Sequence, residues 1–369
     1  MSASTIVSVP TRPHAALHFP WGQTVPPTGE WMTLRPGLHW VRMPLPFALN
    51  HINLWVLSDE LNGQATWTVI DSGVYSLAIH EAWQTLWQGP MACRPLGRML
   101  VTHMHPDHVG NAQWLIDHFS APDAPARLWM SAADYLAATL WCHSITGHDG
   151  ERAARYFRSH GLSDAPSLSK IRKRSAYYAD MVPGVPDAYR RLQDGMQIEI
   201  GGHLWVCIAG FGHAPEHMAL YAADLGVLIS GDMLLPKIST NVSVTDLEPE
   251  GDALGQFLTS LTRYEVLPED TLVLPSHGHP FVGIHARVQQ LRQHHEDRLD
   301  DIRSACAHGP RTAADMLPVL FKRELDLHQT TFAMGEAVAH LNHLWHRGEF
   351  ERMASTDADG TQIWRFGPR

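Results

Sequence analysis

Four metal-binding side chains lie within six residues, directly after the predicted strand Arg98–Thr102. They are His103, His105, Asp107 and His108, spaced His-x-His-x-Asp-His. Side chains alternate along an extended chain, so the first two histidines point the same way and can bind one ion together. Pro106 turns the chain, which lets the aspartate and the third histidine reach a second ion nearby. Imidazole and carboxylate ligands suit zinc or a similar first-row ion, with iron and manganese as alternatives.

Chance is the competing explanation, because the chain holds 25 histidines among 369 residues. Some pairs arise by chance at that frequency, but this spacing after a β-strand pattern is much rarer. Three further candidate ligands also end predicted strands: His213 after Leu204–Ala209, Asp232 after Val227–Ser230, and His277 after Thr271–Pro275. Loops at one edge of a layered fold can bring all of them together, and this shared position is stronger evidence than any single motif.

Length, composition and charge limit the classes of protein. A chain of 369 residues allows two domains, or one large domain with an appendage. Hydrophobic residues at 44% and charged residues at 18% are typical of a globular protein with a substantial core. The formal net charge of −10 argues against a general nucleic-acid or anionic-membrane surface.

Cysteine usage and the N-terminal residues indicate a compartment. The four cysteines are scattered without a C-x-x-C pair, which is typical of thiols in a reducing compartment. Residues 1–20 contain no apolar segment of a signal peptide, and no run reaches the ~18 apolar residues of a membrane span. We therefore expect a cytoplasmic enzyme.

Strand and helix patterns alternate on both sides of the motif, after an irregular arm at residues 1–30. The predicted strands are Leu38–Met43, Ile52–Ser58, Thr66–Ile70, Gly97–Thr102, Arg127–Ser131, Met196–Ile200, Leu204–Ala209, Ala219–Ala222, Val227–Ser230 and Thr271–Pro275. The predicted helices are Val74–Gln88, Gly110–Phe119 and Leu254–Leu267. This order predicts a layered α/β sandwich that spans residues 1–285.

A helical segment at about 132–192 interrupts the strands and carries most of the local positive charge. Its cations are Arg152, Arg155, Arg158, Lys170, Arg172, Lys173, Arg174, Arg190 and Arg191. Aromatic residues accompany them, so the segment as a group suggests a lid over the site. The alternative is a solvated helical face, which is the better reading for any single arginine.

Residues 286–369 form a second predicted unit. Helical patterns at Ile284–His308, Thr312–Leu320 and Thr331–Arg347 precede β-like segments at Gly348–Arg352 and Thr361–Phe366. Helices followed by a hairpin are the order of a winged-helix module, for which nucleic-acid binding is one role. Packing on the catalytic domain, shaping its site or forming a homodimer fits the acidic net charge better.

The order His-x-His-x-Asp-His, then His, Asp and His resembles the metallo-β-lactamase fold superfamily over roughly residues 35–285. Residues 286–369 resemble the winged-helix-like extension of its β-lactamase-like and glyoxalase II-like hydrolases. The resemblance implies an αββα four-layer sandwich with two divalent metals. It implies that His103, His105 and His213 bind one metal, that Asp107, His108 and His277 bind the other, and that Asp232 bridges them. Asp71, which ends an earlier strand, matches the family's acidic residue that orients a ligand.

Each implied role has a physical reason. Two cations about 3.5 Å apart stabilise charge on both the attacking and the leaving oxygen. A bridging water loses a proton near neutral pH, which gives a nucleophilic hydroxide without a side-chain base. Asp107 and Asp232, the two residues expected to act in catalysis, offset part of the metal charge, and Asp107 can orient the hydroxide.

Other histidines are expected to lie outside the metal site. His217, with Glu216, is expected to support the site, and His279 is a candidate for the pocket wall. Surface or helix-packing roles are expected for His51, His294, His295, His340, His343 and His346.

The fold alone does not identify a substrate. Hydrolysis of a small-molecule ester or thioester is the first hypothesis, with Arg172 and Arg174 binding the phosphates of a coenzyme A thioester. Lactone hydrolysis and metal-dependent RNA cleavage are alternatives, and RNA binding would weaken steeply with salt. A third hypothesis is a regulatory protein that keeps the site for metal-dependent folding and acts through contact with a partner. Loss of ligand residues would favour it, and none is missing here.

Overall fold

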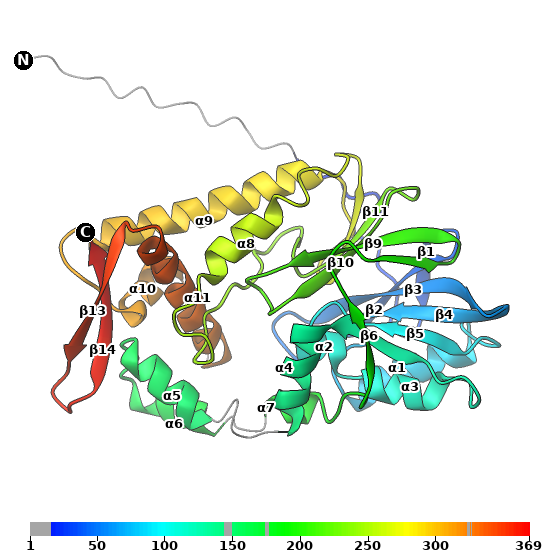
Figure 1. Cartoon of the computed structure of the whole chain (residues 1–369), viewed down its shortest axis with the longest axis horizontal. Coiled ribbons are helices and arrows are strands. Elements are labelled where there is room, and N and C mark those ends of the chain that lie inside the picture. The colour runs from blue at the N-terminus through cyan, green and yellow to red at the C-terminus, as the bar shows by residue number, and fades with distance from the viewer. Residues whose placement is uncertain (1–15, 144–149, 174–176, 323–324, 326) are drawn as a thin grey trace, which may run out of the picture.

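The computed structural model describes residues 16–143, 150–173, 177–322, 325 and 327–369. Within these residues a seven-stranded and a five-stranded mixed β-sheet pack face to face (Figure 1). The first sheet follows chain order: β1 (Trp31–Arg35), β2 (Leu38–Pro44), β3 (His51–Leu61), β4 (Gln64–Ile70), β5 (Leu96–Leu100), β6 (Arg127–Ser131) and β7 (Tyr189–Leu192). Its strands are antiparallel up to β4 and parallel from β4 to β7.

The second sheet has the order β12-β11-β10-β9-β8. Its strands are β8 (Gln197–Ile200), β9 (His203–Gly210), β10 (His217–Ala222), β11 (Val227–Gly231) and β12 (Leu272–Pro275). Only β11 and β12 are parallel neighbours in this sheet. β4 and β5 are also parallel, so the carboxyl ends of β4 and β5 lie side by side, as do those of β11 and β12. The loops that follow these strand ends are the positions where functional side chains are expected.

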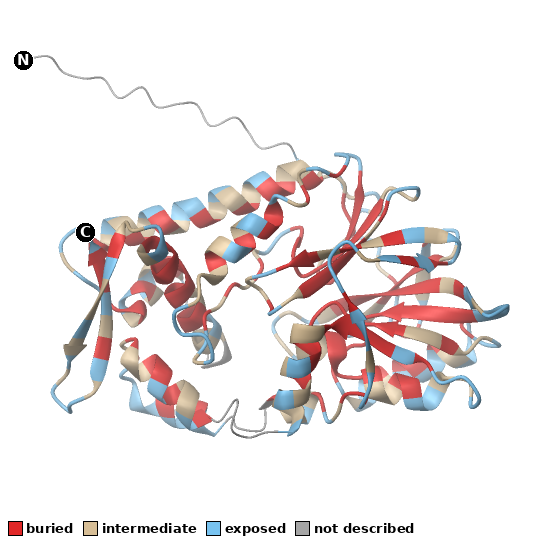
Figure 2. Cartoon of the chain, viewed as in Figure 1, coloured by how far each residue is buried: buried red, intermediate tan, exposed pale blue. Residues whose placement is uncertain are grey.

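Side-chain alternation gives each sheet two apolar faces. In β2, Trp40 packs between the sheets, whereas Val41 and Met43 pack toward the helices on the outer face. That outer face is covered by α1 (Leu77–Gln88) and α3 (Ala112–Phe119). The outer face of the second sheet is covered by α8 (Ala253–Leu261) and α9 (Ile284–Cys306). The result is a helix–sheet–sheet–helix arrangement in which both sheets consist largely of buried residues (Figure 2).

The strand predictions miss two members of the first sheet. β1 lies within a segment for which no strand is predicted, and β7 lies inside the predicted insertion at 132–192. β7 pairs with β6 and is an edge strand with exposed arginines, so it lacks a clear apolar pattern. The predicted helix Leu254–Leu267 is also too long, because α8 ends at Leu261.

The helices of the insertion separate into two groups. α4 (Ala132–His143) and α7 (Tyr177–Met181) lie beside the first sheet, and α5 (Gly150–Ser159) and α6 (Ala165–Arg172) lie near the C-terminal hairpin (Figure 1). The intervening residues 144–149 and 174–176 lie outside the described part of the chain. The function of a lid stays a prediction.

The C-terminal elements follow the predicted order of helices and a hairpin. They are α9, α10 (Ala313–Leu320), α11 (Leu327–His346), β13 (Phe350–Thr356) and β14 (Gln362–Pro368). A capping box between Thr312 and Asp315 begins α10. A winged-helix function of this region stays a prediction. In the described residues no helix has both the length and the apolar character needed to cross a membrane.

Two buried histidines join α9 to α11. His340 Nδ1 donates to the carbonyl oxygen of Glu336, so its Nε2 accepts from His295 Nδ1 at 3.2 Å. Burial, with neighbouring histidines, lowers the pKa of His295 to about 2, and burial lowers the pKa of His340 to about 4. Both side chains are therefore neutral in the folded protein and act as helix-packing residues, as expected from the sequence.

This pair is expected to make the protein sensitive to mild acid. The unfolded chain takes up protons near the ordinary histidine pKa of 6.5, whereas the folded chain does so only near pH 4 or below. The stabilising effect is thus present above pH 6.5 and is lost as the pH falls, by about 2 kcal/mol per histidine between pH 7 and pH 5. In urea unfolding at both pH values, His340→Met should reduce this loss by that amount, and the exposed control His346→Met should not. Equal pH dependence in all three proteins would contradict the assignment.

Candidate metal centre

Loops after the strands bring the predicted ligands together at one edge of the two sheets. β5 delivers His103, His105, Asp107 and His108, and the last two lie in the short helix α2 (Pro106–Val109). His213 follows β9, Asp232 follows β11 and His277 follows β12. All seven predicted positions fall into two groups whose nitrogen and oxygen ligand atoms lie within 4.8 Å of one another.

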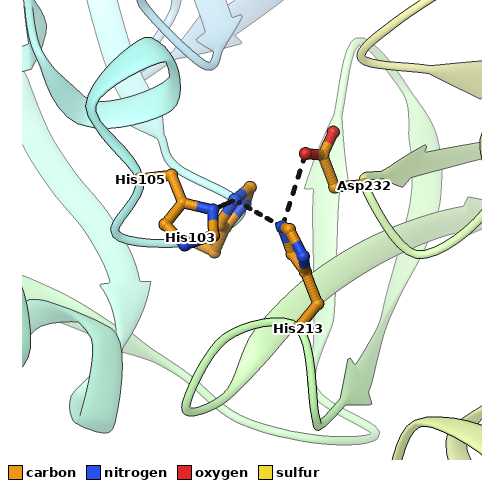
Figure 3. Close-up of side chains that lie close together, drawn as sticks. All are labelled: His103, His105, His213 and Asp232. Carbon is orange, nitrogen blue, oxygen red and sulfur yellow. Dashed lines mark hydrogen bonds and ion pairs between the residues drawn. The ribbon is translucent and has the colours of Figure 1, made fainter. Parts of the chain in front are cut away.

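The first group contains His103, His105, His213 and Asp232 (Figure 3). His103 Nε2 lies 2.8 Å from His105 Nδ1 and 3.2 Å from His213 Nε2. Asp232 Oδ2 lies 3.4 Å from His213 Nε2. These atoms converge on one point from β5, β9 and β11, as the ligands of a single ion must.

The second group contains Asp107, His108 and His277. Asp107 Oδ2 lies 3.4 Å from His277 Nε2 and 3.7 Å from His108 Nε2. The other oxygen of Asp232, Oδ1, lies 3.4 Å from His277 Nε2 and 3.7 Å from His108 Nε2. One carboxylate therefore faces both groups, which is the position that a bridging ligand requires.

The donor atoms fit divalent cations. His108 Nε2 and Asp232 Oδ1 are buried and have no hydrogen-bond partner among the described residues. Buried polar atoms without partners are costly, and a cation held between imidazole nitrogens and carboxylate oxygens would satisfy them. The residues present thus fit two His/Asp metal sites.

Hydrogen bonds on the far side of the rings orient the candidate ligands. His213 Nδ1 donates to the carbonyl oxygen of Asn241 at 2.7 Å, and His277 Nδ1 donates to that of His51 at 2.8 Å. His108 Nδ1 donates to Asp71 Oδ2 at 2.8 Å. Each bond fixes the tautomer in which Nε2 has a free lone pair for a metal.

Asp71 lies where the sequence predicts an orienting carboxylate. Besides His108, it accepts hydrogen bonds from the backbone N–H of Thr102 at 2.8 Å and from the Thr102 hydroxyl at 2.9 Å. Its backbone φ of 62° is unusual for a residue other than glycine. The bonds to Thr102 join the ends of β4 and β5, so Asp71 fixes the strand end from which the motif begins.

Burial and local charge favour the ligand forms of some candidate ligands and oppose those of others. Although burial opposes protonation, the neighbouring carboxylates raise the pKa of His108 well above its ordinary value and raise that of His277 to about 10, so a bound cation would replace a proton on these two rings. Burial, together with the neighbouring histidines, lowers the pKa of His103 well below its ordinary value and lowers that of His105 to about 3. Although burial opposes ionisation of Asp232, His277 and His108 hold its pKa well below the ordinary range. Neutral imidazoles and an ionised carboxylate are the ligand forms of a divalent metal.

A buried carboxylate that the sequence analysis missed supports the motif. Asp134 accepts hydrogen bonds from the backbone N–H groups of Met104, at 2.8 Å, and Glu216, at 2.6 Å. The Tyr178 hydroxyl donates to the carbonyl oxygen of Met104 at 2.5 Å. Met104 is therefore held on both sides, which fixes its neighbours His103 and His105. Ser131, which accepts from the Asp134 N–H at 3.2 Å, begins α4 with a capping pattern that could have indicated this position.

Three other histidines named in the sequence analysis lie near the metal ligands in different positions. His217 is buried behind the first group, where its Nε2 accepts from the backbone N–H of Asp232 at 3.2 Å, in the expected supporting role. His279 is partly exposed on the loop that follows His277, and its ring lies 6.4 Å from that of Trp40. The surface role expected for His51 is wrong, because His51 bonds both to His277 and, through Nε2, to the Gly278 N–H at 2.8 Å.

The structure does not bring Arg172 to the metal ligands. Its Nε pairs with Glu151 at 2.7 Å on the surface of α5 and α6, away from α2 (Figure 1). Arg174 lies outside the described residues. The contacts of Arg172 therefore give no support to the predicted binding of coenzyme A phosphates.

Comparisons with known proteins agree with this geometry. The model of the metallo-beta-lactamase superfamily matches residues 50–277, and that of the metallo-beta-lactamase-like C-terminal domain matches residues 299–369. A crystal structure of a beta-lactamase domain protein from Burkholderia ambifaria is 48% identical, with a TM-score of 0.89 over 96% of this chain and 98% of that one. A metallo-beta-lactamase family protein from Thermus thermophilus is 27% identical, with a TM-score of 0.73 over 91% of this chain and 100% of that one.

A curated relative has a sequence that extends over most of this chain. It is the Bacillus subtilis protein named "Probable metallo-hydrolase YqjP", which is 25% identical over 317 residues, or 82% of this chain and 90% of that protein. The superfamily model matches more than half of the chain and includes both groups of ligands. The chain therefore belongs to the metallo-β-lactamase superfamily and has the paired His/Asp metal site of a metal-dependent hydrolase.

Proposed function

We propose that the protein hydrolyses a small-molecule ester or thioester. The observation that carries the proposal is the position of Asp232, whose two oxygens face two complete groups of ligands. Two divalent ions bound there would supply an activated water as nucleophile and a Lewis acid for the carbonyl oxygen. Zinc fits the donor set, and iron or manganese are alternatives.

Asp107 is suited to orient the attacking water. Although burial opposes ionisation, His108 and His277 hold the pKa of Asp107 at about 2, so its carboxylate only accepts hydrogen bonds at neutral pH. His277 and His108 also keep Asp232 ionised. Its two oxygens face His213 of the first group and His277 of the second. Asp71 and Asn241 hold the rings of His108 and His213, so the water and the scissile bond meet a preorganised site.

Small substrates fit the charge distribution better than RNA. The formal net charge is −10, and several cations of the C-terminal region are paired with acids. Arg303 and Arg347 pair with Glu349, and Arg352 pairs with Glu250 at 2.8 Å. Paired arginines are poor phosphate ligands, because a new contact must replace an existing one. The cytoplasmic location and a homodimer remain predictions.

A hydrolysis screen on metal-reconstituted protein tests the proposal. The panel contains acyl-CoA thioesters, aryl esters, lactones and a short RNA, and each is also offered to the variant Asp107→Ala. Turnover of esters or thioesters that falls at least about 100-fold in the variant, with RNA untouched, is the expected result. Cleavage of RNA alone would overturn the proposal in favour of a nuclease. Equal turnover by wild type and Asp107→Ala would show that the metal centre does not take part in the reaction.

A further inference from the structure

An arginine on the inner face of β2 lies beside the metal centre. Leu38 and Trp40 pack between the two sheets, and Arg42 follows them on the same face because side chains alternate. In the register of the first sheet, Arg42 faces Asn53 of β3. The guanidinium group therefore emerges at the end of the inter-sheet core.

Contacts of Asn53 place this end of β2 against the loop that carries His277. Asn53 Nδ2 donates to the carbonyl oxygens of Pro275, at 2.8 Å, and Gly278, at 3.2 Å. Trp40 Nε1 donates to Asn53 Oδ1 at 2.9 Å, and the ring of Trp40 lies 6.4 Å from that of His279. Arg42 is thus the next inward-facing residue beyond Trp40, on the side of the candidate metal ligand His277.

The guanidinium of Arg42 has no counterion among the residues that the structure describes. Within the same residues its Nη1 is buried and has no hydrogen-bond partner. Burial lowers the pKa of Arg42, and no acidic neighbour opposes that effect. A second cation lies near the loop that carries His277, because Lys237 follows Pro236, whose ring lies against Gly278.

We propose that Arg42 binds an anionic group of the substrate, a carboxylate or a phosphate, while the metal centre acts on the ester or thioester bond. The inference rests on the proposed function and specifies the substrate class: esters of acids that carry a second, negatively charged group. Lys237, which is exposed, would add to the attraction from the rim of the site.

The physical argument is the cost of an unpaired buried donor. A partly buried guanidinium with an unsatisfied N–H loses hydration without replacement, and an anion restores the lost interaction through charge-assisted hydrogen bonds. The planar fork of arginine matches the two oxygens of a carboxylate or phosphate. Such bonds contribute about 1.5–3 kcal/mol, which corresponds to about 10- to 100-fold in binding.

Esters that differ only in charge provide the test. Nitrophenyl pentanoate and mono-nitrophenyl glutarate have the same leaving group and acyl length, and a third ester ends its five-carbon acyl group in a phosphate. Arg42→Met should raise KM about 10- to 100-fold for at least one anionic ester. The kcat for that ester, and both KM and kcat for the neutral ester, should change less than about twofold. Arg42→Lys should give an intermediate KM. The control Arg35→Met, an exposed arginine of β1, should leave all three esters unchanged.

A binding measurement keeps this inference separate from the proposed function. Glutarate and inorganic phosphate are titrated calorimetrically into metal-loaded wild type, Arg42→Met and Arg35→Met, all checked for native circular dichroism. Weaker binding of either anion by Arg42→Met alone supports the site even if no ester is hydrolysed, and identifies the preferred anion. Equal binding by all three proteins, or equal rises in KM for charged and neutral esters, would overturn the role of Arg42. If Arg42→Met does not fold, the same binding and KM measurements are made on Arg42→Lys and wild type, and equal values for the two proteins would overturn the role of Arg42.

Discussion

Replacing Asp232 with alanine is expected to reduce turnover by about 10³-fold or more and to reduce the metal content from two ions toward one. Asp232 Oδ2 faces His213 and Asp232 Oδ1 faces His277, so the variant removes one ligand from each group. Metal ions contribute several kcal/mol to the stabilisation of transition-state charge, and each 1.36 kcal/mol corresponds to about tenfold in rate. Loss of the second ion therefore accounts for an effect of this size.

Asp224→Ala is the matched control for that variant. Asp224 also follows a strand of the second sheet, but it is exposed and pairs with His203 at 2.6 Å, away from the metal ligands. Elemental analysis and kcat on the substrate found by the hydrolysis screen are measured for both variants. Two bound ions and a kcat within tenfold of wild type in Asp232→Ala would show that this carboxylate does not bridge.

The candidate ligands could be predicted because their signals are local. The motif from His103 to His108 is contiguous, and His213, Asp232 and His277 each follow an apolar strand pattern. Parallel neighbours β4 and β5, and again β11 and β12, then place strand ends side by side. A short pattern combined with this topology is enough to indicate a shared site.

The supporting residues could not be predicted because their partners are distant in sequence. Asn53 bonds to residues more than 220 positions away, and Asp134 joins Met104 to Glu216. No local pattern distinguishes Asn53 from an ordinary polar residue of a strand. The charge of Arg42 likewise becomes informative only when the register places it at the end of the inter-sheet core, with no counterion in the described part of the chain.

The predicted insertion at 132–192 also shows that sequence alone does not reveal which charged residues are already paired. Nine cations between residues 152 and 191, together with aromatic residues, suggested a lid, and Arg172 and Arg174 suggested phosphate binding. Arg172 pairs with Glu151, and Arg190 stacks over Trp129 with its guanidinium carbon 4.8 Å from the ring centroid. Clustering in sequence overstated the number of cations available to a ligand, because many were already paired in the fold. One isolated arginine in β2 is a better candidate than this cluster.

Gly231→Ala is expected to destabilise the fold by about 3 kcal/mol or more. Gly231 ends β11 with a φ of +53°, and an added Cβ would lie 2.1 Å from Nε2 and 2.6 Å from Cε1 of His217. His217 is buried and its Nε2 accepts from the Asp232 N–H, so neither the ring nor the strand can move without disturbing a candidate metal ligand. Overpacking of this kind costs about 1–3 kcal/mol or more, in addition to about 1 kcal/mol for an alanine at positive φ.

Gly226→Ala separates the two contributions to that cost. Gly226 has a similar φ of +60°, and a Cβ added there meets nothing within 4 Å, so only the backbone contribution of about 1 kcal/mol remains. Urea unfolding followed by tryptophan fluorescence measures both variants. In the double variant Gly231→Ala with His217→Ala, removal of the ring should recover most of the overpacking cost. Equal losses in the two glycine variants would show that His217 can move, and the strand end that carries Asp232 would then be less rigid than a bridging carboxylate requires.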